Sequence, residues 1–180
     1  MTLLAISGSL RAASSNSVLL RAAQALAPHG VEVRLYDGMG QLPHFSPDVE
    51  GGEAVAQLKR AVIEANGVLF CTPEYVHGLP GSFKNLLDWL VSDGELWNKP
   101  VAVLSARKSE FAEPQLREIL RTLMAPICEQ ASIVVPFPTN KISEEEVLKN
   151  AELTHAVHTA MLAFVHYVGH GGGSQGEGFN

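Results

Sequence analysis

Six side chains suited to holding an anion fall within ten residues near the start of the chain. The segment reads Gly8-Ser9-Leu10-Arg11-Ala12-Ala13-Ser14-Ser15-Asn16-Ser17 and offers four hydroxyls, one guanidinium and one amide. It lies between an apolar run and a helical pattern, and a helix N-terminus favours an anion through its unpaired amides and its dipole. Hydroxyl donors and the fork of Arg11 strengthen such a site, so we predict binding of a phosphate monoester. The alternative is a polar turn in which Ser14 or Ser15 caps the helix.

The spacing within this segment argues against two common nucleotide motifs. Residues 8–17 fit neither G-x-x-x-x-G-K-[ST] nor G-x-G-x-x-G. We therefore expect neither a nucleoside-triphosphate P-loop nor a standard dinucleotide fingerprint.

A second loop with chemical potential follows a buried strand and reads Pro73-Glu74-Tyr75-Val76-His77-Gly78-Leu79-Pro80-Gly81. Its prolines stiffen the backbone, and its glycines allow close approach to a flat or crowded ligand. Tyr75 offers a face or an edge to an aromatic ligand. The alternative is a rigid connector whose tyrosine packs on the next helix. Because this loop is expected at the same sheet edge as the first loop, ligand binding is favoured over the role of a connector.

The cysteine and histidine patterns predict neither a nucleophile nor a metal site. A low-molecular-weight phosphatase needs an arginine six residues after its cysteine, whereas His77 stands six residues after Cys71. We therefore expect Cys71 to be a buried, inert thiol. His155 and His158 have helical spacing, but they lack an acidic or cysteine partner at ligand spacing. A polar stripe on a helix is the expected outcome.

Composition limits the classes of partner. The chain has 180 residues, of which 46% are hydrophobic and 18% charged, with a formal net charge of −6. This length can bury one core, and the absence of a basic stripe argues against nucleic acid as a partner. Two cysteines cannot form a disulfide framework, and nothing resembles a secretory leader, so a cytoplasmic location is expected. The apolar run at residues 160–165 is far shorter than the ~20 residues of a membrane span, so no membrane partner is expected.

The elements that must position these loops alternate along the chain. Five apolar runs predict strands, at residues 3–6, 31–35, 67–72, 101–104 and 133–135. Amphipathic patterns between them predict helices, and a last helix begins at Ser143, in a capping box with Glu146, and ends near Val168. The alternation predicts an α/β fold with a five-stranded parallel sheet and helices on both faces. Ligands bind such sheets at the carboxyl ends of the strands.

The two loops together resemble the NADPH-dependent FMN reductase family, flavodoxin-like flavoproteins that include quinone, azo-dye and chromate reductases. The residues that carry the resemblance are Gly8-Ser9-Leu10-Arg11, Ser14, Asn16, Pro73-Glu74-Tyr75, Pro80-Gly81, Lys84-Asn85 and Asp88-Trp89. The order and separation of the predicted elements match over residues 1–167. The resemblance implies a flavodoxin-like three-layer sandwich. We expect an FMN-binding domain at residues 1–168 and a Gly-rich disordered tail at residues 169–180.

The resemblance also implies a cofactor and its contacts. FMN is expected, with its phosphate held by Ser9, Arg11, Ser14, Asn16 and Ser17. The isoalloxazine ring is expected beside Pro73, Glu74, Tyr75 and Val76. The implied reductant is NADPH or NADH, and the implied partner is a small-molecule electron acceptor. Members are commonly dimers or tetramers with the cofactor near a subunit interface, so we expect a homodimer or homotetramer.

A third flavin loop is implied after the fourth strand, where family members usually carry glycines whose amides contact the ring. Here the segment reads Ser105-Ala106-Arg107-Lys108-Ser109-Glu110-Phe111 and has no glycine. Ser105 is the expected cofactor contact. Arg107 and Lys108 offer positive charge instead, to an anionic flavin or to a phosphate of the nicotinamide dinucleotide.

The leading hypothesis is an FMN-dependent NAD(P)H oxidoreductase that passes hydride through FMN to a quinone, flavin or similar acceptor. No catalytic side chain is expected, because the cofactor carries the hydride chemistry and the protein orients it. The loop at 105–111 motivates an alternative, a flavin- or nucleotide-binding protein with little reductase activity. A flavodoxin-type electron carrier is the third hypothesis.

Overall fold

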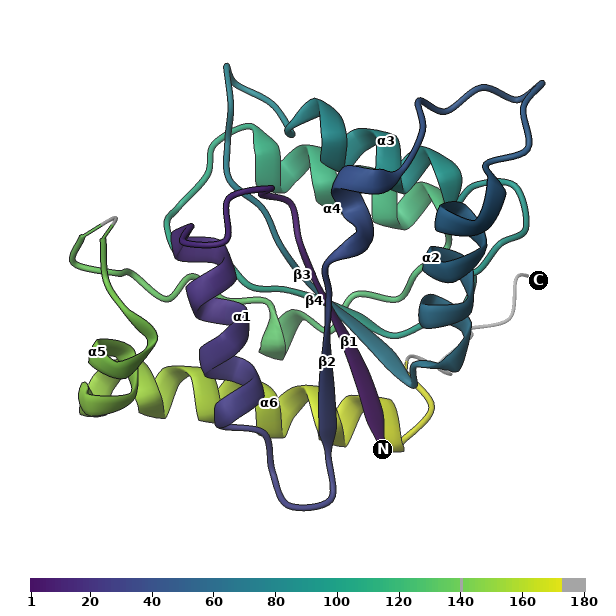
Figure 1. Ribbon diagram of the computed structural model, residues 1–180. Coiled ribbons are helices and arrows are strands. Elements are labelled where there is room, and N and C mark those ends of the chain that lie inside the picture. The colour runs from purple at the N-terminus through teal and green to yellow at the C-terminus, as the bar shows by residue number, and fades with distance from the viewer. Residues whose placement is uncertain (140, 173–180) are drawn as a thin grey trace, which may run out of the picture.

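The computed structural model describes residues 1–139 and 141–172. Its four-stranded parallel sheet has the order β2-β1-β3-β4 (Figure 1). The strands are β1 (Thr2–Ser7), β2 (Glu32–Tyr36), β3 (Gly67–Cys71) and β4 (Val101–Val103). The helices are α1 (Ser15–Ala25), α2 (Gly52–Glu64), α3 (Gly81–Trp89), α4 (Ala112–Thr122), α5 (Glu144–Lys149) and α6 (Ala151–Gly169), with short 3-10 helices η1 (Gly38–Gln41) and η2 (Glu129–Ala131).

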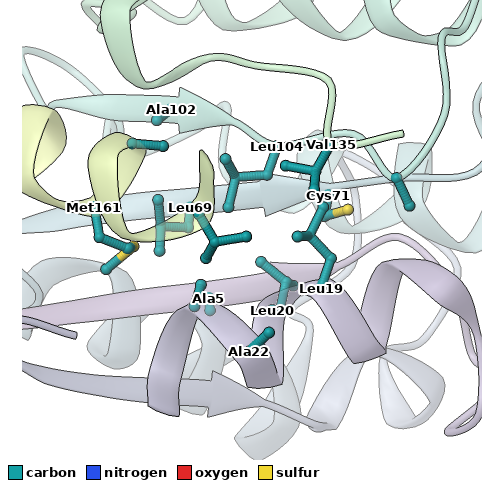
Figure 2. Close-up of a cluster of buried hydrophobic side chains, with 14 of the residues drawn as sticks. Ala5, Leu19, Leu20, Ala22, Leu69, Cys71, Ala102, Leu104, Val135 and Met161 are labelled. Carbon is teal, nitrogen blue, oxygen red and sulfur yellow. The ribbon is translucent and has the colours of Figure 1, made fainter. Parts of the chain in front are cut away.

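Helices cover both faces of this sheet and complete a three-layer sandwich (Figure 1). One core lies between the sheet and α1, α5 and α6, and Figure 2 shows Leu19 and Leu20 of α1 directed at Ala5, Leu69 and Cys71. The other core lies between the sheet and α2, α3 and α4. Burial on both faces explains why the central strands β1 and β3 are continuous apolar runs rather than alternating ones.

The prediction of a fifth strand at residues 133–135 was wrong. This segment forms only one isolated bridge, between Val134 and Ser105, and a second isolated bridge joins Ile127, earlier in the chain, to Val101 of β4. The turn η2 interrupts the ladder, and there the Ser132 hydroxyl accepts the Val103 N–H at 3.0 Å in place of a backbone carbonyl. The same hydroxyl donates to the Cys128 carbonyl at 2.8 Å. A side-chain hydroxyl thus takes the place of a backbone carbonyl in the strand pairing. An apolar sequence pattern gives no sign of this substitution.

The prediction of a single last helix from Ser143 to Val168 was also wrong in one respect. The capping box of Ser143 and Glu146 is present, but the helix ends at Lys149. Asn150 leaves the helical conformation, and its side chain accepts from the amides of Glu152 and Leu153 to cap α6. The predicted tail at 169–180 lies outside the described residues from 173 onward. Among the residues described, no helix has both the length and the apolar character that a membrane span needs.

A buried ion contact fixes α2 to the connection between α3 and β4. The Glu95 side chain is 1% exposed, and Lys59 Nζ lies 3.3 Å from its Oε1. Neither Glu95 oxygen accepts a hydrogen bond from the described part of the chain. Lys59 also contacts the exposed carboxylate of Asp93. Lys59 is therefore the charge that offsets burial of Glu95.

We predict that Lys59→Met lowers the free energy of unfolding by about 3 kcal/mol, because it leaves a buried carboxylate without its cation. The double variant Lys59→Met/Glu95→Met should recover most of this loss, since both charges are then gone. Urea denaturation of the wild type and both variants measures the effect. A single variant as stable as the wild type contradicts this role for Lys59.

Candidate functional site

Loops at the carboxyl ends of β1, β3 and β4 enclose a cavity of about 540 Å³. This volume suits a cofactor or a drug-sized ligand. Its lining comes from four segments of the chain: Ser9, Arg11 and residues 13–16; residues 72–75; residues 106–109; and Lys141. The register brings these loops together, because Ser7 at the end of β1 pairs with Cys71 at the end of β3.

Gly8 allows the first loop to lie directly on the second. Its N–H donates to the Cys71 carbonyl at 2.8 Å, which continues the contact between β1 and β3. A Cβ at this position would lie 2.3 Å from Thr72 Oγ1 and 2.7 Å from Thr72 Cβ. Real Cβ atoms do not approach that closely, so the loop geometry requires glycine here.

The hydroxyls of the first loop organise the N-terminus of α1. Ser14 caps the helix by accepting the Ser17 N–H at 3.1 Å, as the polar-turn alternative expects. The Ser17 hydroxyl exchanges hydrogen bonds with Ser14 at 2.8 Å and with Ser7 at 3.1 Å. Ser17 does not line this cavity but a neighbouring one of about 340 Å³. The first turn of α1 has no acidic residue, so its dipole is open to an external anion.

Asn16 links the cavity to the core beneath it. Its Oδ1 accepts the Cys71 thiol at 3.2 Å, which leaves the donor end of the amide for a ligand. Asn16 is buried and lines the cavity. Cys71 is fully buried, and burial raises the pKa of its thiol far above the ordinary value. A thiol that resists ionisation is inert as a nucleophile, as the sequence predicts.

The second loop turns sharply just beyond the cavity. Tyr75 and Gly78 exchange backbone hydrogen bonds of 3.0 and 3.1 Å, and the two residues between them have positive φ angles of 50° and 55°. Such angles define a type I′ turn, a strained conformation for β-branched Val76. The turn directs Val76 into solvent, where its side chain is fully exposed, whereas Tyr75 lines the cavity. His77 stacks on Phe111 with ring centroids 4.3 Å apart.

Glu74 joins the second loop to the third. Its Oε2 accepts from the Ser109 hydroxyl at 2.8 Å, the Phe111 N–H at 2.9 Å and the Ala112 N–H at 3.2 Å. The Phe111 amide, then Ser109, lower the pKa of this carboxyl from its ordinary value of 4.5. Glu74 therefore satisfies the free amides at the start of α4 and holds two walls of the cavity together.

Ser105 faces away from the cavity. It is buried, its hydroxyl donates to Glu113 Oε2 at 3.2 Å, and its backbone pairs with Ile133 and Val135. The third loop instead presents Ala106, Arg107, Lys108 and Ser109 to the cavity. Side chains thus line the cavity at the place where the resembled family usually carries glycines.

Positive charge without a partner gathers at this cavity. Of the 13 lysines and arginines, eight form salt bridges among the described residues. Lys99 donates to the carbonyls of Ile63 and Ala65. The other four have no salt bridge within the described ranges, and all line the cavity: Arg11, Arg107, Lys108 and Lys141. Lys141 was missed from the sequence, although its position shortly after the apolar run at residues 133–135 could have indicated this edge.

Two of the residues that carry the family resemblance, Asn85 and Trp89, anchor a loop and do not line the cavity. Asn85 Nδ2 and Trp89 Nε1 both donate to the Pro43 carbonyl at 2.9 Å. Asn85 also accepts the Phe45 N–H at 2.7 Å, and Phe45 packs edge-on against Trp89. They fix the long connection between η1 and α2 on α3. Within residues 1–139 and 141–172, no cluster of three or more His, Cys, Asp or Glu side chains could hold a metal.

Comparisons with known proteins identify a family and relatives that are similar in sequence to this chain. The profile of the NADPH-dependent FMN reductase family matches residues 1–139. A quinone reductase from Escherichia coli strain K12 is 30% identical over 160 residues, which cover 82% of this chain and 85% of that protein. An NAD(P)H-dependent FMN reductase from Pseudomonas aeruginosa is 36% identical over 123 residues, 66% of each chain.

Solved structures agree on the fold. A flavoenzyme NAD(P)H:(acceptor) oxidoreductase from Paracoccus denitrificans superposes with a TM-score of 0.77 at 26% identity, covering 95% of this chain and 98% of that one. The fold is therefore α/β and flavodoxin-like, with four strands in the sheet.

The Glu74→Gln variant tests the tether between the loops. The wild-type carboxylate is ionised above its lowered pKa, so its contribution is complete above the ordinary value of 4.5 and is lost as pH falls through the lowered value. After correction for intrinsic exchange, protection of the Phe111 and Ala112 amides against hydrogen exchange should fall in this acidic range. In the Glu74→Gln variant, these two amides should be less protected at neutral pH than in the wild type. Their protection should also show no decrease as the pH falls through the acidic range. Equal protection in both proteins rejects the tether.

Proposed function

Because the chain belongs to the NADPH-dependent FMN reductase family, we propose that it binds FMN in the cavity between its loops and reduces a small acceptor at the expense of NADPH or NADH. The acceptor is a quinone, a flavin or a similar small molecule. The observation that carries this proposal is that one cavity is lined by four cations without a salt bridge in the described part of the chain, although the net charge of the chain is −6.

The first loop fits the phosphate of FMN. Its donors are the helix N-terminus, the hydroxyls of Ser9 and Ser14, the Asn16 amide and the Arg11 guanidinium, all at the cavity wall. Opposed charge and several donors are what a phosphate monoester requires. Ser17 does not line the cavity, and it stabilises this loop through hydrogen bonds of its hydroxyl with those of Ser14 and Ser7.

The second and third loops fit the ring. Pro73, Glu74 and Tyr75 form one wall, and Ala106 with Arg107 forms another. Tyr75 offers an aromatic surface, and Glu74 fixes the spacing between the walls. Val76 and Ser105 are proposed to act through the backbone of their loops, because their side chains point elsewhere.

FMN, when bound, supplies the hydride chemistry that links a nicotinamide to an acceptor. The residues of this chain bind and orient it. Arg11 and its neighbouring hydroxyls fix the phosphate, and the loop walls fix the ring. Arg107, Lys108 and Lys141 make negative charge within the cavity less costly. No side chain of the chain has to act as an acid, base or nucleophile for this role.

We also propose that the protein is a homodimer or homotetramer in the cytoplasm. Tyr75, Val76 and Phe111 are exposed apolar side chains on the second and third loops, and a second subunit would bury them. Both cysteines are free thiols, which suits a reducing compartment. Sedimentation equilibrium tests the oligomer.

The absorbance spectrum of the purified protein with added FMN tests the function. Bound FMN should be bleached by anaerobic NADPH or NADH and should return to its oxidised spectrum when a quinone is added. Protein that cannot be loaded with FMN refutes the proposal. FMN binding without oxidation of either dinucleotide, across several acceptors, favours a flavin-binding protein instead.

Arg11→Gln should weaken FMN binding by about tenfold or more, since a hydrogen bond to a charged group contributes about 1.5–3 kcal/mol and about 1.4 kcal/mol is tenfold. Quenching of FMN fluorescence measures the dissociation constant. Arg60→Gln is the matched control, because Arg60 is exposed on α2 in an ion pair with Glu53. An unchanged constant in Arg11→Gln removes Arg11 from the site.

A further inference from the structure

A second hollow adjoins the FMN cavity and continues outward along α4. This groove has a volume of about 530 Å³ and is lined by Lys108, Ser109, Glu113, Pro114, Arg117, Arg121 and Val134. Lys108 and Ser109 line both the groove and the cavity, so the two hollows are adjacent at these residues. A ligand that occupies the cavity can therefore extend into the groove.

The groove combines positive charge with an apolar surface. It has three cations, Lys108, Arg117 and Arg121, against the single carboxylate of Glu113. Pro114 and Val134 are exposed and supply apolar contact between the charged groups. This combination suits a ligand with a planar apolar part and anionic groups.

The cations of the groove differ in how far their donors are committed. Arg117 donates to Glu113 at 3.0 Å and to Glu129 at 2.7 Å, and it is only 16% exposed. Arg121 is 59% exposed, and its nearest carboxylate oxygen, on Glu118, is 3.7 Å away. Arg121 and Lys108 are therefore the groups that can bind an added anion, while Arg117 contributes positive potential.

The two available cations differ in position, because Lys108 lines both hollows whereas Arg121 lines the groove but not the cavity. Lys108 is at the junction with the cavity, and Arg121 lies two turns along α4 from Glu113. Residues 113 and 121 are separated by about 12 Å along the helix axis at 1.5 Å per residue. The positions 113, 117 and 121 share one face, since side chains four apart on a helix are neighbours.

We propose that this groove binds the adenosine half of NADPH and makes the protein select NADPH over NADH. This inference rests on the proposed function and adds to it that the nicotinamide enters the adjoining cavity, beside the FMN. Lys108, with Arg107 beside it, binds the diphosphate at the junction. The adenine lies on Pro114 and Val134, and Arg121 binds the 2′-phosphate, the group that distinguishes the two dinucleotides. A neutral quinone offers no anion to these cations and is not the occupant that their charge fits.

Binding of two nicotinamide-free probes tests the groove, and calorimetry is performed on the protein with and without added FMN. Adenosine 2′,5′-bisphosphate and 5′-AMP differ only in the 2′-phosphate. The bisphosphate should bind about tenfold more tightly to the wild type, and Arg121→Gln should abolish this difference, as expected for one charge-assisted contact. Arg60→Gln, at an exposed arginine that lines neither hollow, should keep it. Equal binding of both probes to the wild type overturns the proposal.

Steady-state kinetics supplies the second arm. Arg121→Gln should raise the KM for NADPH about tenfold and leave the KM for NADH and both kcat values unchanged. A parallel rise for both dinucleotides, or no change, overturns the assignment of Arg121. If the protein binds the bisphosphate selectively but reduces no acceptor, the proposed function fails and the groove stands. If reduction proceeds without discrimination between the dinucleotides, the function stands and the groove fails.

Discussion

The close approach of the β1 loop to the end of β3 is the constraint on which the rest of the site depends. The N–H of Gly8 bonds the Cys71 carbonyl, and no Cβ separates it from Thr72. This contact brings the N-terminus of α1 beside the loop that carries Glu74. Glu74 in turn holds the start of α4 through Ser109 and two amides. One backbone contact thus aligns the walls of a cavity drawn from distant parts of the chain.

Electrostatics is the basis on which we propose that this cavity selects anionic ligands. The chain is acidic overall, yet Arg11, Arg107, Lys108 and Lys141 face the cavity without carboxylate partners in the described part of the protein. Cations held together repel one another, and an anion bound among them relieves the repulsion. An FMN phosphate fits the side of Arg11 and α1. The charge on the third loop remains for a second anionic ligand, and the groove beyond Lys108 gives that ligand room.

Patterns local in the sequence predicted much of the fold and part of the site. The apolar runs located the four strands, and the spacing of Ser143 and Glu146 located a helix start. Features set by single long-range contacts were not predictable. The Ser132 hydroxyl accepts the Val103 N–H in place of a backbone carbonyl, so the predicted fifth strand does not form a ladder with β4. The Ser105 hydroxyl donates to Glu113 instead of facing the cavity. Lys141 lines the cavity because the folded chain brings it beside the other three segments, and no periodicity in the sequence indicates this. Which side chain faces a ligand depends on such contacts rather than on periodicity.

The central claim is that this cavity recognises a phosphorylated flavin through its unpaired cations and the N-terminus of α1. The most direct measurement compares the dissociation constants of FMN and riboflavin, which share a ring and differ in the phosphate. Charge-assisted bonds to the phosphate predict that FMN binds at least about a hundredfold more tightly at low ionic strength. The preference should narrow as salt is added. Equal affinity for the two flavins at low ionic strength would contradict the account.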